Sequence, residues 1–385
     1  MNLRDKLRAI ETTPKKPNPV PMEKRYNACW SKEEIRPVAD YMDAFALKRE
    51  TVNLMCGDME PPLPDVLDPM RILYLDTETT GLAGGTGTVA FLVGVGRLTM
   101  DGFRIQQFVM RDYPEERFVL ARVAEALDEC DTICTFNGRT FDVPLLKDRF
   151  LMNRMSPACL EKPHIDLLHI ARRVWKMRLK RCTLSHLEEA VLGTPRLKDL
   201  PGSEAPQRYF SFLKTGQFCL LDEVIAHNAQ DIASLCTLLS AMTNLYEHPE
   251  KHPYEEDLFS MGVALEKFHH PEEARRCYHL ASRGVTRTKG QLRLAQSWRR
   301  SGQRQEAVDV WLHMIDRHEG GITPYVEMAK HYEHVERNIP KAMEMTRRAM
   351  MMMAEPTLFD TLDTMEKRKA LRHRYDRLKK KTQKE

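Results

Sequence analysis

Four acidic residues stand in contexts that suit the binding of divalent cations. Asp76 and Glu78, in the segment YLDTETTGL, are separated by one residue, so on a β-strand both side chains point to the same face. Two carboxylates at this spacing repel each other unless a cation lies between them, and carboxylate oxygens are the ligands that Mg²⁺ and Mn²⁺ prefer. An Asp-x-Glu pair alone is common and most often structural, but the glycine-rich turn after it lets a ligand approach the backbone closely.

The third acid, Asp142, lies in the segment TFNGRTFDVPLL. It follows a predicted strand and turn, and Pro144 is tolerated in the first turn of a helix, so Asp142 is predicted at a helix N-cap. A purely capping role is the alternative to metal binding. Asn137, which precedes the helix, is either structural or a contact for the substrate, and the sequence leaves both interpretations open.

The fourth acid, Asp231, lies in VIAHNAQDIASLCTLL, a predicted helix with an apolar stripe. A carboxylate beside that stripe needs a partner, which a metal ion would supply; an exposed helical aspartate is the alternative. His227 precedes Asp231 by four residues and therefore lies on the same helix face. This spacing suits a general base acting on a water molecule, although a histidine in a core or capping position would fit it too.

These acids together could hold two cations about 4 Å apart. One ion would activate a water molecule and the other would stabilise a leaving 3′ oxygen, while both offset the charge that builds on a phosphate. The chemistry predicted from these residues is therefore the hydrolysis of a phosphodiester. Two ions and a water molecule suffice for it, so no organic cofactor is expected.

The elements expected around the acids form an α/β domain. Short runs rich in strand formers, ILYLD, VAFLVGVGRL and FRIQQFVM, precede a predicted helix over 114–129 and a fourth strand, DTICTFNG. Strands first, and then strand and helix in alternation, indicate a mixed sheet flanked by helices. Further helices are predicted over 142–152, 166–177, 183–191 and 222–246.

Residues 1–70 are predicted to be an N-terminal extension and linker. A short helix fits residues 3–10, and the segment 13–21 is too rich in proline for a helix. Residues 31–50 are helix-like. The α/β domain is expected over 71–247.

Beyond residue 254 the strand pattern gives way to helices with an internal repeat. Four positions recur 33 residues later, namely Gly262, Ala274, Tyr278 and Ala281 as Ala295, Ala307, Trp311 and Met314. A third copy, shifted by two residues, has Ala329, Ala342 and Ala349. Small residues at helix crossings and a period of about 34 residues are typical of tetratricopeptide helix pairs. Residues 254–365 are therefore predicted to be an all-α repeat domain of this kind, with an unrelated helical bundle as the alternative.

Residues 366–385 form a basic tail. This segment has ten Lys or Arg residues against three Asp or Glu, and the resulting net charge of seven exceeds the +4 of the whole chain. A solvated helix face would explain this charge, and so would contact with nucleic acid.

The composition argues against a membrane or secreted protein. No run of about 18 uncharged apolar residues occurs, and the segment MNLRDKLRAI is charged, so neither a membrane span nor a signal peptide is expected. The nine cysteines are scattered and form no CxxC motif. This pattern favours reduced thiols in a cytoplasmic protein.

The motifs together resemble a known family. The strings D-x-E-T-T-G-L, N-G-x-x-F-D and H-N-x-x-D-I-x-S-L are similar to those of the DEDD exonuclease superfamily, which has the RNase H-like fold. Longer strings, among them GLAGGTGTVAFLVGVG, PHIDLLHIARR and LPGSEAPQRYF, resemble bacterial RNase H-like proteins of the YprB type, some of which carry tetratricopeptide repeats. The resemblance spans about residues 20–350 and is strongest over 71–240.

The resemblance implies roles for particular residues. The implied metal ligands are Asp76, Glu78, Asp142 and Asp231, and the residues implied to pack against the terminal base and sugar are Thr79 and Leu82. The sequence departs from the family at His227, which stands four residues before the last aspartate. The two main subgroups have a histidine five residues before it or a tyrosine four before it, so a histidine here occupies the place of the tyrosine. Asp166, in HIDL, is expected to support the site or cap a helix.

We therefore expect a metal-dependent nuclease, most simply a 3′–5′ exonuclease of the DEDD type. It would use two Mg²⁺ or Mn²⁺ ions on DNA or RNA with a single-stranded 3′ end. A structure-specific endonuclease with the same acids is one alternative. The other is a non-catalytic nucleic-acid-binding scaffold that recruits proteins through the repeats, although four intact acids speak against it.

Overall fold

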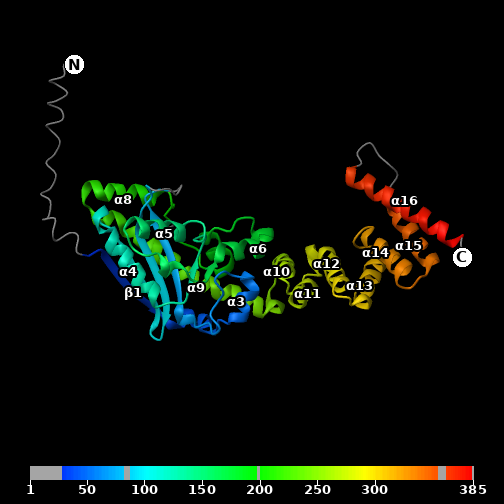
Figure 1. Ribbon diagram of the computed structural model, residues 1–385, viewed down its shortest axis with the longest axis horizontal. Helices are drawn as coiled ribbons and strands as arrows, with labels where there is room; N and C mark the ends of the chain where they lie inside the picture. The colour runs from blue at the N-terminus through cyan, green and yellow to red at the C-terminus, as the bar shows by residue number, and fades with distance from the viewer. Residues whose placement is uncertain (1–27, 82–86, 197–199, 354–360, 384–385) are drawn as a thin grey trace, which may run out of the picture. The chain divides into compact units, whose positions relative to one another are not determined.

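The computed structural model describes residues 28–81, 87–196, 200–353 and 361–383 (Figure 1). The helix and the linker predicted over 3–10 and 13–21 lie outside these ranges, and so does Leu82. Contacts divide the chain into two units that alternate along the sequence. The first unit takes the described parts of 1–49, 59–168 and 183–241, and the second those of 50–58, 169–182 and 242–385.

One mixed sheet of six strands organises the described residues of the first unit. The strands are β1 (Trp30–Pro37), β2 (Ile72–Thr79), β3 (Ala90–Thr99), β4 (Gly102–Val109), β5 (Thr132–Thr135) and β6 (His164–Asp166). Their order is β1-β4-β3-β2-β5-β6. The first four strands in this order pair antiparallel, whereas β2 pairs parallel with β5, and β5 with β6. The predicted mixed sheet is confirmed, with β2 in its interior.

Strand β1 corrects the prediction for residues 31–50. These residues are helix-like in sequence, but Trp30–Pro37 pair with β4 along their whole length, and helix begins only with a 3₁₀ segment at Val38–Ala46. An edge strand can carry charged side chains, and Gln106 Nε2 on β4 donates to Glu33 Oε2 at 2.7 Å. Pairing with the sheet therefore outweighs the local helix propensity.

Helices surround the sheet. Those of the first unit are α4 (Glu116–Asp128), α5 (Asp142–Met152), α7 (Leu184–Leu187) and α8 (Glu204–Thr215), while α6 (Leu167–Leu179) and α9 (Asp222–Glu247) contribute residues to both units. The helix predicted over 142–152 is confirmed as α5. Helix α8 escapes prediction because LPGSEAPQRYF contains two prolines; Pro206 lies in the first turn of α8, where proline is tolerated.

Two glycines of β3 let α9 lie close to the sheet. A Cβ atom at Gly94 would come within 2.1 Å of Asn228 Oδ1, and one at Gly96 within 2.4 Å of Ile232 Cγ2. A larger residue at either position would push the helix away from the strand. The segment VGVG thereby sets the separation between α9 and the sheet.

The second unit is helical from residue 255 onward in its described part. Its helices follow one another in Figure 1 as α10 (Glu255–Lys267), α11 (Pro271–Leu280), α12 (Arg287–Arg300), α13 (Arg304–Asp316), α14 (Thr323–His334), α15 (Ile339–Met352) and α16 (Leu362–Thr382), after α3 (Arg49–Cys56) earlier in the chain. The small residues of the repeat are buried, with Gly262, Ala295 and Ala329 in the first helices of successive pairs. The helical C-terminal region is confirmed, whereas its assignment to the tetratricopeptide class stays a prediction.

Helix α16 carries the described part of the basic tail. Buried Glu333 of α14 accepts hydrogen bonds from Arg374 at 3.2 Å, Arg377 at 2.7 Å and Lys381 at 2.9 Å. These three charges dock the helix. Other basic side chains of α16 are exposed, namely Lys369, Arg372, Lys379 and Lys380.

Within the described ranges, no helix is both long and apolar enough to cross a membrane. All nine cysteines of the chain fall in these ranges, and no disulfide joins them.

Candidate active site

Strand β2 brings Asp76 and Glu78 to the face of the sheet that α9 covers. Asp76 lies opposite Gly94 of β3, and both acidic side chains are partly buried. The strand register shifts between Glu78 and Thr79. The Thr79 hydroxyl then donates to the carbonyl of Gly81 at 2.8 Å, so this side chain shapes the turn that follows the acidic pair.

Asp142 is the first residue of α5 and not its N-cap, which is Phe141. The Asp142 carboxylate turns toward β2, where its Oδ1 accepts the N–H of Thr77 at 3.1 Å and the Thr77 hydroxyl at 2.5 Å. The predicted N-cap is therefore wrong by one residue, because donors on β2 hold this carboxylate. A purely capping role for Asp142 does not fit this geometry.

A loop held by Asp166 delivers Asp142 to the site. Asp166 Oδ1 accepts the N–H groups of Asn137 at 2.8 Å and Leu168 at 3.1 Å, and its Oδ2 accepts that of Arg139 at 3.1 Å. Asn137 has a φ of 69°, in the left-handed region that asparagine tolerates better than most residues. Asp166 thus supports the turn, and the backbone of Asn137 belongs to that turn.

Helix α9 presents His227 and Asp231 from one face. His227 Nε2 lies 3.5 Å from Asp231 Oδ2, as their four-residue spacing predicts. His227 Nδ1 lies 3.1 Å from Arg196 Nη1. Because a guanidinium has no acceptor, Nδ1 must accept this bond, which leaves the ring proton on Nε2 and facing Asp231.

Arg196 and Glu188 are residues of this site that the sequence does not reveal. Arg196 Nη2 donates to Asp231 Oδ1 and, at 2.8 Å, to Glu188 Oε1, while Arg196 Nε donates to Glu188 Oε2. Glu188 is fully buried at the start of a π-helical turn and also accepts the hydroxyl of Ser234. No motif spacing links these segments, so only the folded chain brings them together.

Asn228 is a further site residue, and here the sequence does carry a signal. It is a polar residue beside His227 in the predicted helix, and it is fully buried. Asn228 Nδ2 donates to Asp76 Oδ2 at 2.8 Å. Gln107 Nε2 donates to Asn228 Oδ1 at 2.9 Å and to the carbonyl of Ile225 at 2.7 Å. The Ile225 carbonyl fixes the orientation of the Gln107 amide, which in turn aims the Asn228 NH₂ group at Asp76.

Burial and repulsion from neighbouring acids raise the pKa values of both acids on β2. Burial raises the pKa of Asp76 well above its ordinary value, repulsion from Asp231, Asp142 and Glu78 adds to the rise, and the Asn228 hydrogen bond opposes it. Burial, together with repulsion from Asp231 and Asp142, raises the pKa of Glu78 to about 8. Two acids on β2 thus respond to acids on α5 and α9.

The pKa values of Asp142 and Asp231 are raised as well. Burial raises the pKa of Asp142 to about 6, against the hydrogen bonds from Thr77. Burial also raises the pKa of Asp231, while His227 and Arg196 oppose the rise. In such a cluster a cation would relieve the repulsion between carboxylates.

The donors of this cluster suit a hard divalent cation by type. All are carboxylate oxygens, which Mg²⁺ and Mn²⁺ prefer. Among the residues that the structure describes, however, no three Asp, Glu, His or Cys side chains are arranged to hold a metal ion as they stand. Protein donors already bind one oxygen each of Asp76, Asp142 and Asp231, so an ion would have to use the acceptor sites that these bonds leave or displace a donor.

A pocket of about 900 Å³ opens beside His227. Its wall includes the charged Arg196, the polar Gln230 and the apolar Pro195 and Leu200. A ligand in this pocket would therefore meet charged and apolar surface beside His227.

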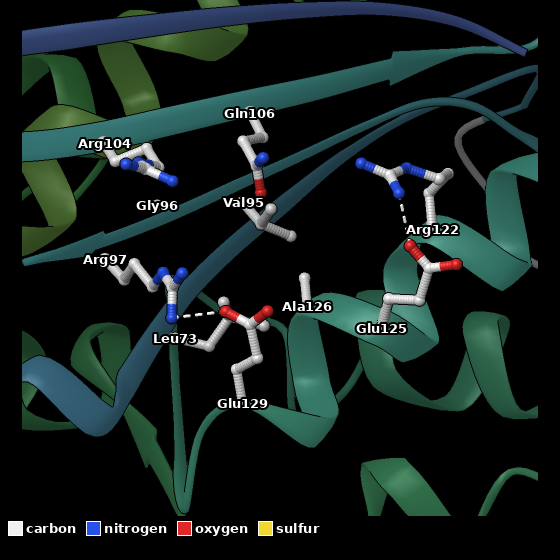
Figure 2. Close-up of a pocket in the computed structure, with 10 residues that line it drawn as sticks. All are labelled: Leu73, Val95, Gly96, Arg97, Arg104, Gln106, Arg122, Glu125, Ala126 and Glu129. Atoms are coloured by element: carbon white, nitrogen blue, oxygen red, sulfur yellow. Dashed lines mark hydrogen bonds and ion pairs between the residues drawn. The ribbon is translucent and has the colours of Figure 1, made fainter.

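A smaller cavity of about 120 Å³ lies between the sheet and α4, lined in part by Leu73 (Figure 2). Arg97 Nη1 pairs with Glu129 at 2.5 Å, and Arg122 pairs with Glu125. Because these arginines already face glutamates, the cavity is a poor site for an anion.

Comparison with known proteins places the chain in a family. YprB of Bacillus subtilis strain 168 is 32% identical over 292 residues, and the match covers 73% of this chain and 69% of that protein. The chain belongs to the YprB family. Residues 73–243 also match the RNase_H superfamily, a span that runs from β2 into α9 and includes all four acids. The domain of this YprB family member is therefore RNase H-like.

Among solved structures, the family B DNA polymerase of Pyrobaculum calidifontis shares 16% identity over 61% of this chain, with a TM-score of 0.37, and the match covers 30% of the polymerase. A likeness this low says nothing about what the YprB family member does.

Proposed function

We propose that the protein is a metal-dependent nuclease that hydrolyses phosphodiester bonds of nucleic acid as a 3′–5′ exonuclease of the DEDD type. The observation that carries the proposal is the cluster of four buried carboxylates from β2, α5 and α9, in which burial raises all four pKa values and Asp142 and Asp231 repel the two acids of β2. An RNase H-like domain suits a nuclease, but a fold supports many functions, so the proposal rests on the cluster.

In this proposal Asp76, Glu78, Asp142 and Asp231 would hold two divalent cations, Mg²⁺ or Mn²⁺. When bound, such ions supply an activated water molecule and neutralise charge on the phosphate and the leaving oxygen. The protein supplies rigid placement, since bonds from Thr77 and Asn228 orient two of the carboxylates.

His227 is the proposed general base, one helical turn from Asp231. An imidazole nitrogen can take a proton from water only if its lone pair is not already engaged. The bond between Nδ1 and Arg196 therefore has to open before this nitrogen can serve.

The proposed substrate is DNA or RNA with a single-stranded 3′ end, and Thr79, Leu82 and Asn137 would contact its last nucleotide. The Thr79 hydroxyl and the backbone N–H of Asn137 already form hydrogen bonds in the two turns. Other atoms of these two residues would therefore contact the nucleotide. The helical C-terminal region, proposed to be tetratricopeptide-like, would offer a surface for a protein partner.

A cleavage screen tests this function. Single- and double-stranded DNA and RNA with a 3′ label are incubated with the full chain and Mn²⁺, beside circular single strands of the same sequences. Release of single nucleotides from linear strands, with circles left intact, is the expected result. Cutting of circles would replace the exonuclease by an endonuclease with the same acids. No Mn²⁺-dependent cleavage of any substrate would favour a non-catalytic scaffold.

A further inference from the structure

Arg196 stands among the acids of the site although no motif predicts it there. We propose that Arg196 exchanges anionic partners: it pairs with Asp231 while the site holds no metal ion, and with a phosphate of the nucleic acid once an ion has taken Asp231. This inference rests on the proposed function, because the ion and the phosphate are those of the nuclease reaction.

Arg196 and a metal ion would compete for the same oxygen. Arg196 Nη2 donates to Asp231 Oδ1, and among the described residues Asp231 is the one acid of the four that forms an ion pair with an arginine. A charge-assisted bond of this type is among the stronger ones in proteins. An ion that coordinates Asp231 has to displace the guanidinium or bind beside its positive charge, and either cost lowers the affinity of the free protein for metal.

Glu188 keeps Arg196 at the site after that displacement. The Glu188 carboxylate is fully buried and pairs with both Nε and Nη2 of Arg196. Leaving a buried carboxylate without its cation is strongly unfavourable. Arg196 therefore retains Glu188 as its anchor, and the contacts that change are those to Asp231 and His227.

The same exchange would let His227 act as the general base. While Arg196 Nη1 is bound to His227 Nδ1 at 3.1 Å, Nδ1 is an acceptor and the Nε2 proton faces Asp231. Neither nitrogen in this arrangement takes a proton from water. A shift of the guanidinium on its Glu188 anchor would break the bond to Nδ1 and the bond to Asp231 Oδ1, so a single side-chain movement would change a contact of a metal ligand and a contact of the proposed base.

Once an ion has taken Asp231, a phosphate group is the anion that suits Arg196. Arg196 and His227 line the same pocket of about 900 Å³, so a strand end that enters it meets the guanidinium and the imidazole together. The planar fork of arginine matches the oxygens of a phosphate, and the N–H donors released from Asp231 and His227 can bind it while Glu188 holds the other edge. Binding of metal and of phosphate would then favour each other, as linked equilibria require.

Mn²⁺ binding to the full chain, measured by titration calorimetry without nucleic acid, tests the competition. Arg196→Gln is expected to bind Mn²⁺ about five- to tenfold more tightly than wild type. Arg208→Gln is the matched control, since Arg208 lines the same pocket but pairs with Glu223 at 2.6 Å. Arg208→Gln is expected to leave Mn²⁺ affinity unchanged.

A double variant guards against misfolding. Arg196→Gln alone leaves Glu188 buried without its cation, so Glu188→Gln is combined with Arg196→Gln to keep the interior neutral. The double variant is expected to fold and to bind Mn²⁺ as tightly as the single one.

The phosphate half of the proposal has its own readout. In saturating Mn²⁺, thymidine and adenosine 5′-monophosphates are titrated into each variant. Arg196→Gln is expected to weaken the better ligand at least fivefold, and Arg208→Gln to weaken it less. Equal affinity for wild type and Arg196→Gln overturns the assignment of a phosphate to Arg196.

The results for Mn²⁺ distinguish a failure of the Arg196 exchange from a failure of the proposed metal site. Weaker or unchanged Mn²⁺ binding in both Arg196 variants, with clear binding in wild type, overturns the competition and leaves the metal site standing. Absence of Mn²⁺ binding in wild type and in every variant overturns the metal site together with this inference. Binding that appears only in the Arg196 variants supports the competition most strongly.

Discussion

At the residue scale, Glu78 shows how costly the acid cluster is without a cation. Its pKa is raised from an ordinary 4.5 to about 8 by burial and by repulsion from Asp231 and Asp142. A carboxyl group whose pKa is higher in the folded state stabilises the fold below its ordinary pKa. That contribution is lost as the pH rises through the folded value. Between about pH 4.5 and pH 8 the metal-free protein should therefore lose stability through Glu78.

This loss predicts a pH-dependent effect of Glu78→Gln. At about pH 8.5, which is above the raised pKa of Glu78, the variant is expected to melt about 2–4 °C higher than wild type in EDTA. The reason is that the variant carries no buried charge at this position. At about pH 4 the Glu78 carboxyl is largely protonated in both the folded and the unfolded protein, and the two melting temperatures are expected to come close together. Scanning calorimetry at both pH values measures the effect. A variant that is less stable at the higher pH would show that the Glu78 charge is not repelled.

His227 gives a second prediction at this scale. His227→Ala is expected to lower kcat by about 10²–10⁴-fold, the usual contribution of a general base, and to change substrate binding much less. Single-turnover rates and equilibrium binding of a 3′-labelled oligonucleotide separate the two effects. An equal loss of rate and of binding would assign His227 to substrate contact and not to proton transfer.

How much the sequence reveals at this scale depends on how far apart the partners lie. Asp76 and Glu78 are neighbours on a strand, and His227 and Asp231 are neighbours on a helix, so periodicity alone relates each pair. The bond from Asn228 to Asp76 joins positions 152 residues apart. The bond from Arg196 to Asp231 depends on how a π-helical turn and the segment after it return to α9. Only folding reveals such pairs.

At the element scale, the fit of α9 against β3 decides where the acids meet. Gly94 leaves room for Asn228, whose amide links Gln107 on β4 to Asp76 on β2. A side chain at position 94 would move the amide, the helix or both. The position of Asp231 relative to the β2 acids therefore depends on a glycine that has no chemical role of its own.

A double-mutant cycle tests this packing. Gly94→Ala places a Cβ atom 2.1 Å from Asn228 Oδ1 and is expected to destabilise the protein. Asn228→Ala removes the opposing group, at the cost of buried donors left unpaired. The double variant is expected to be about 1–3 kcal/mol more stable than the sum of the two single effects predicts. Denaturant unfolding measures the cycle, and strictly additive effects would contradict close contact between the two residues.

The elements that sequence patterns identify are the regular ones. β2, α5 and α9 have strong apolar patterns and local end signals, and the structure has them close to where they are predicted. β1 is misread because its charged residues favour a helix until β4 pairs with it. The three-residue β6 (His164–Asp166) is too short for periodicity, and its parallel partner β5 lies about 30 residues earlier in the chain.

At the scale of the whole molecule, the basic helix α16 has two sets of charges with different roles. Arg374, Arg377 and Lys381 surround buried Glu333, so these residues are structural. The second set is exposed and does not contact Glu333; it includes Lys369, Arg372, Lys379 and Lys380. A solvated face and a nucleic-acid contact both fit that set, and an affinity measurement distinguishes them.

If the exposed face binds nucleic acid, changing these four residues to Gln should weaken the affinity for a single-stranded oligonucleotide. Each lost phosphate contact should also lower the salt slope, by about 0.7 for a single strand. The matched control changes four exposed basic residues on other helices to Gln, namely Lys267, Lys289, Arg304 and Arg347. Fluorescence anisotropy across a salt series measures both sets. Equal affinity and slope in wild type and the α16 variant would identify a solvated face.

The central claim is that the four acids perform phosphodiester hydrolysis. Its most direct test compares wild type with Asp76→Ala and Asp231→Ala in the Mn²⁺-dependent release of nucleotides from 3′-labelled linear single strands. Melting curves of each protein verify that the fold is kept. Wild type is expected to shorten the strands from the labelled end, and both folded variants are expected to lose this activity by at least about 10³-fold. Folded Asp76→Ala and Asp231→Ala proteins that cut as fast as wild type would contradict the claim.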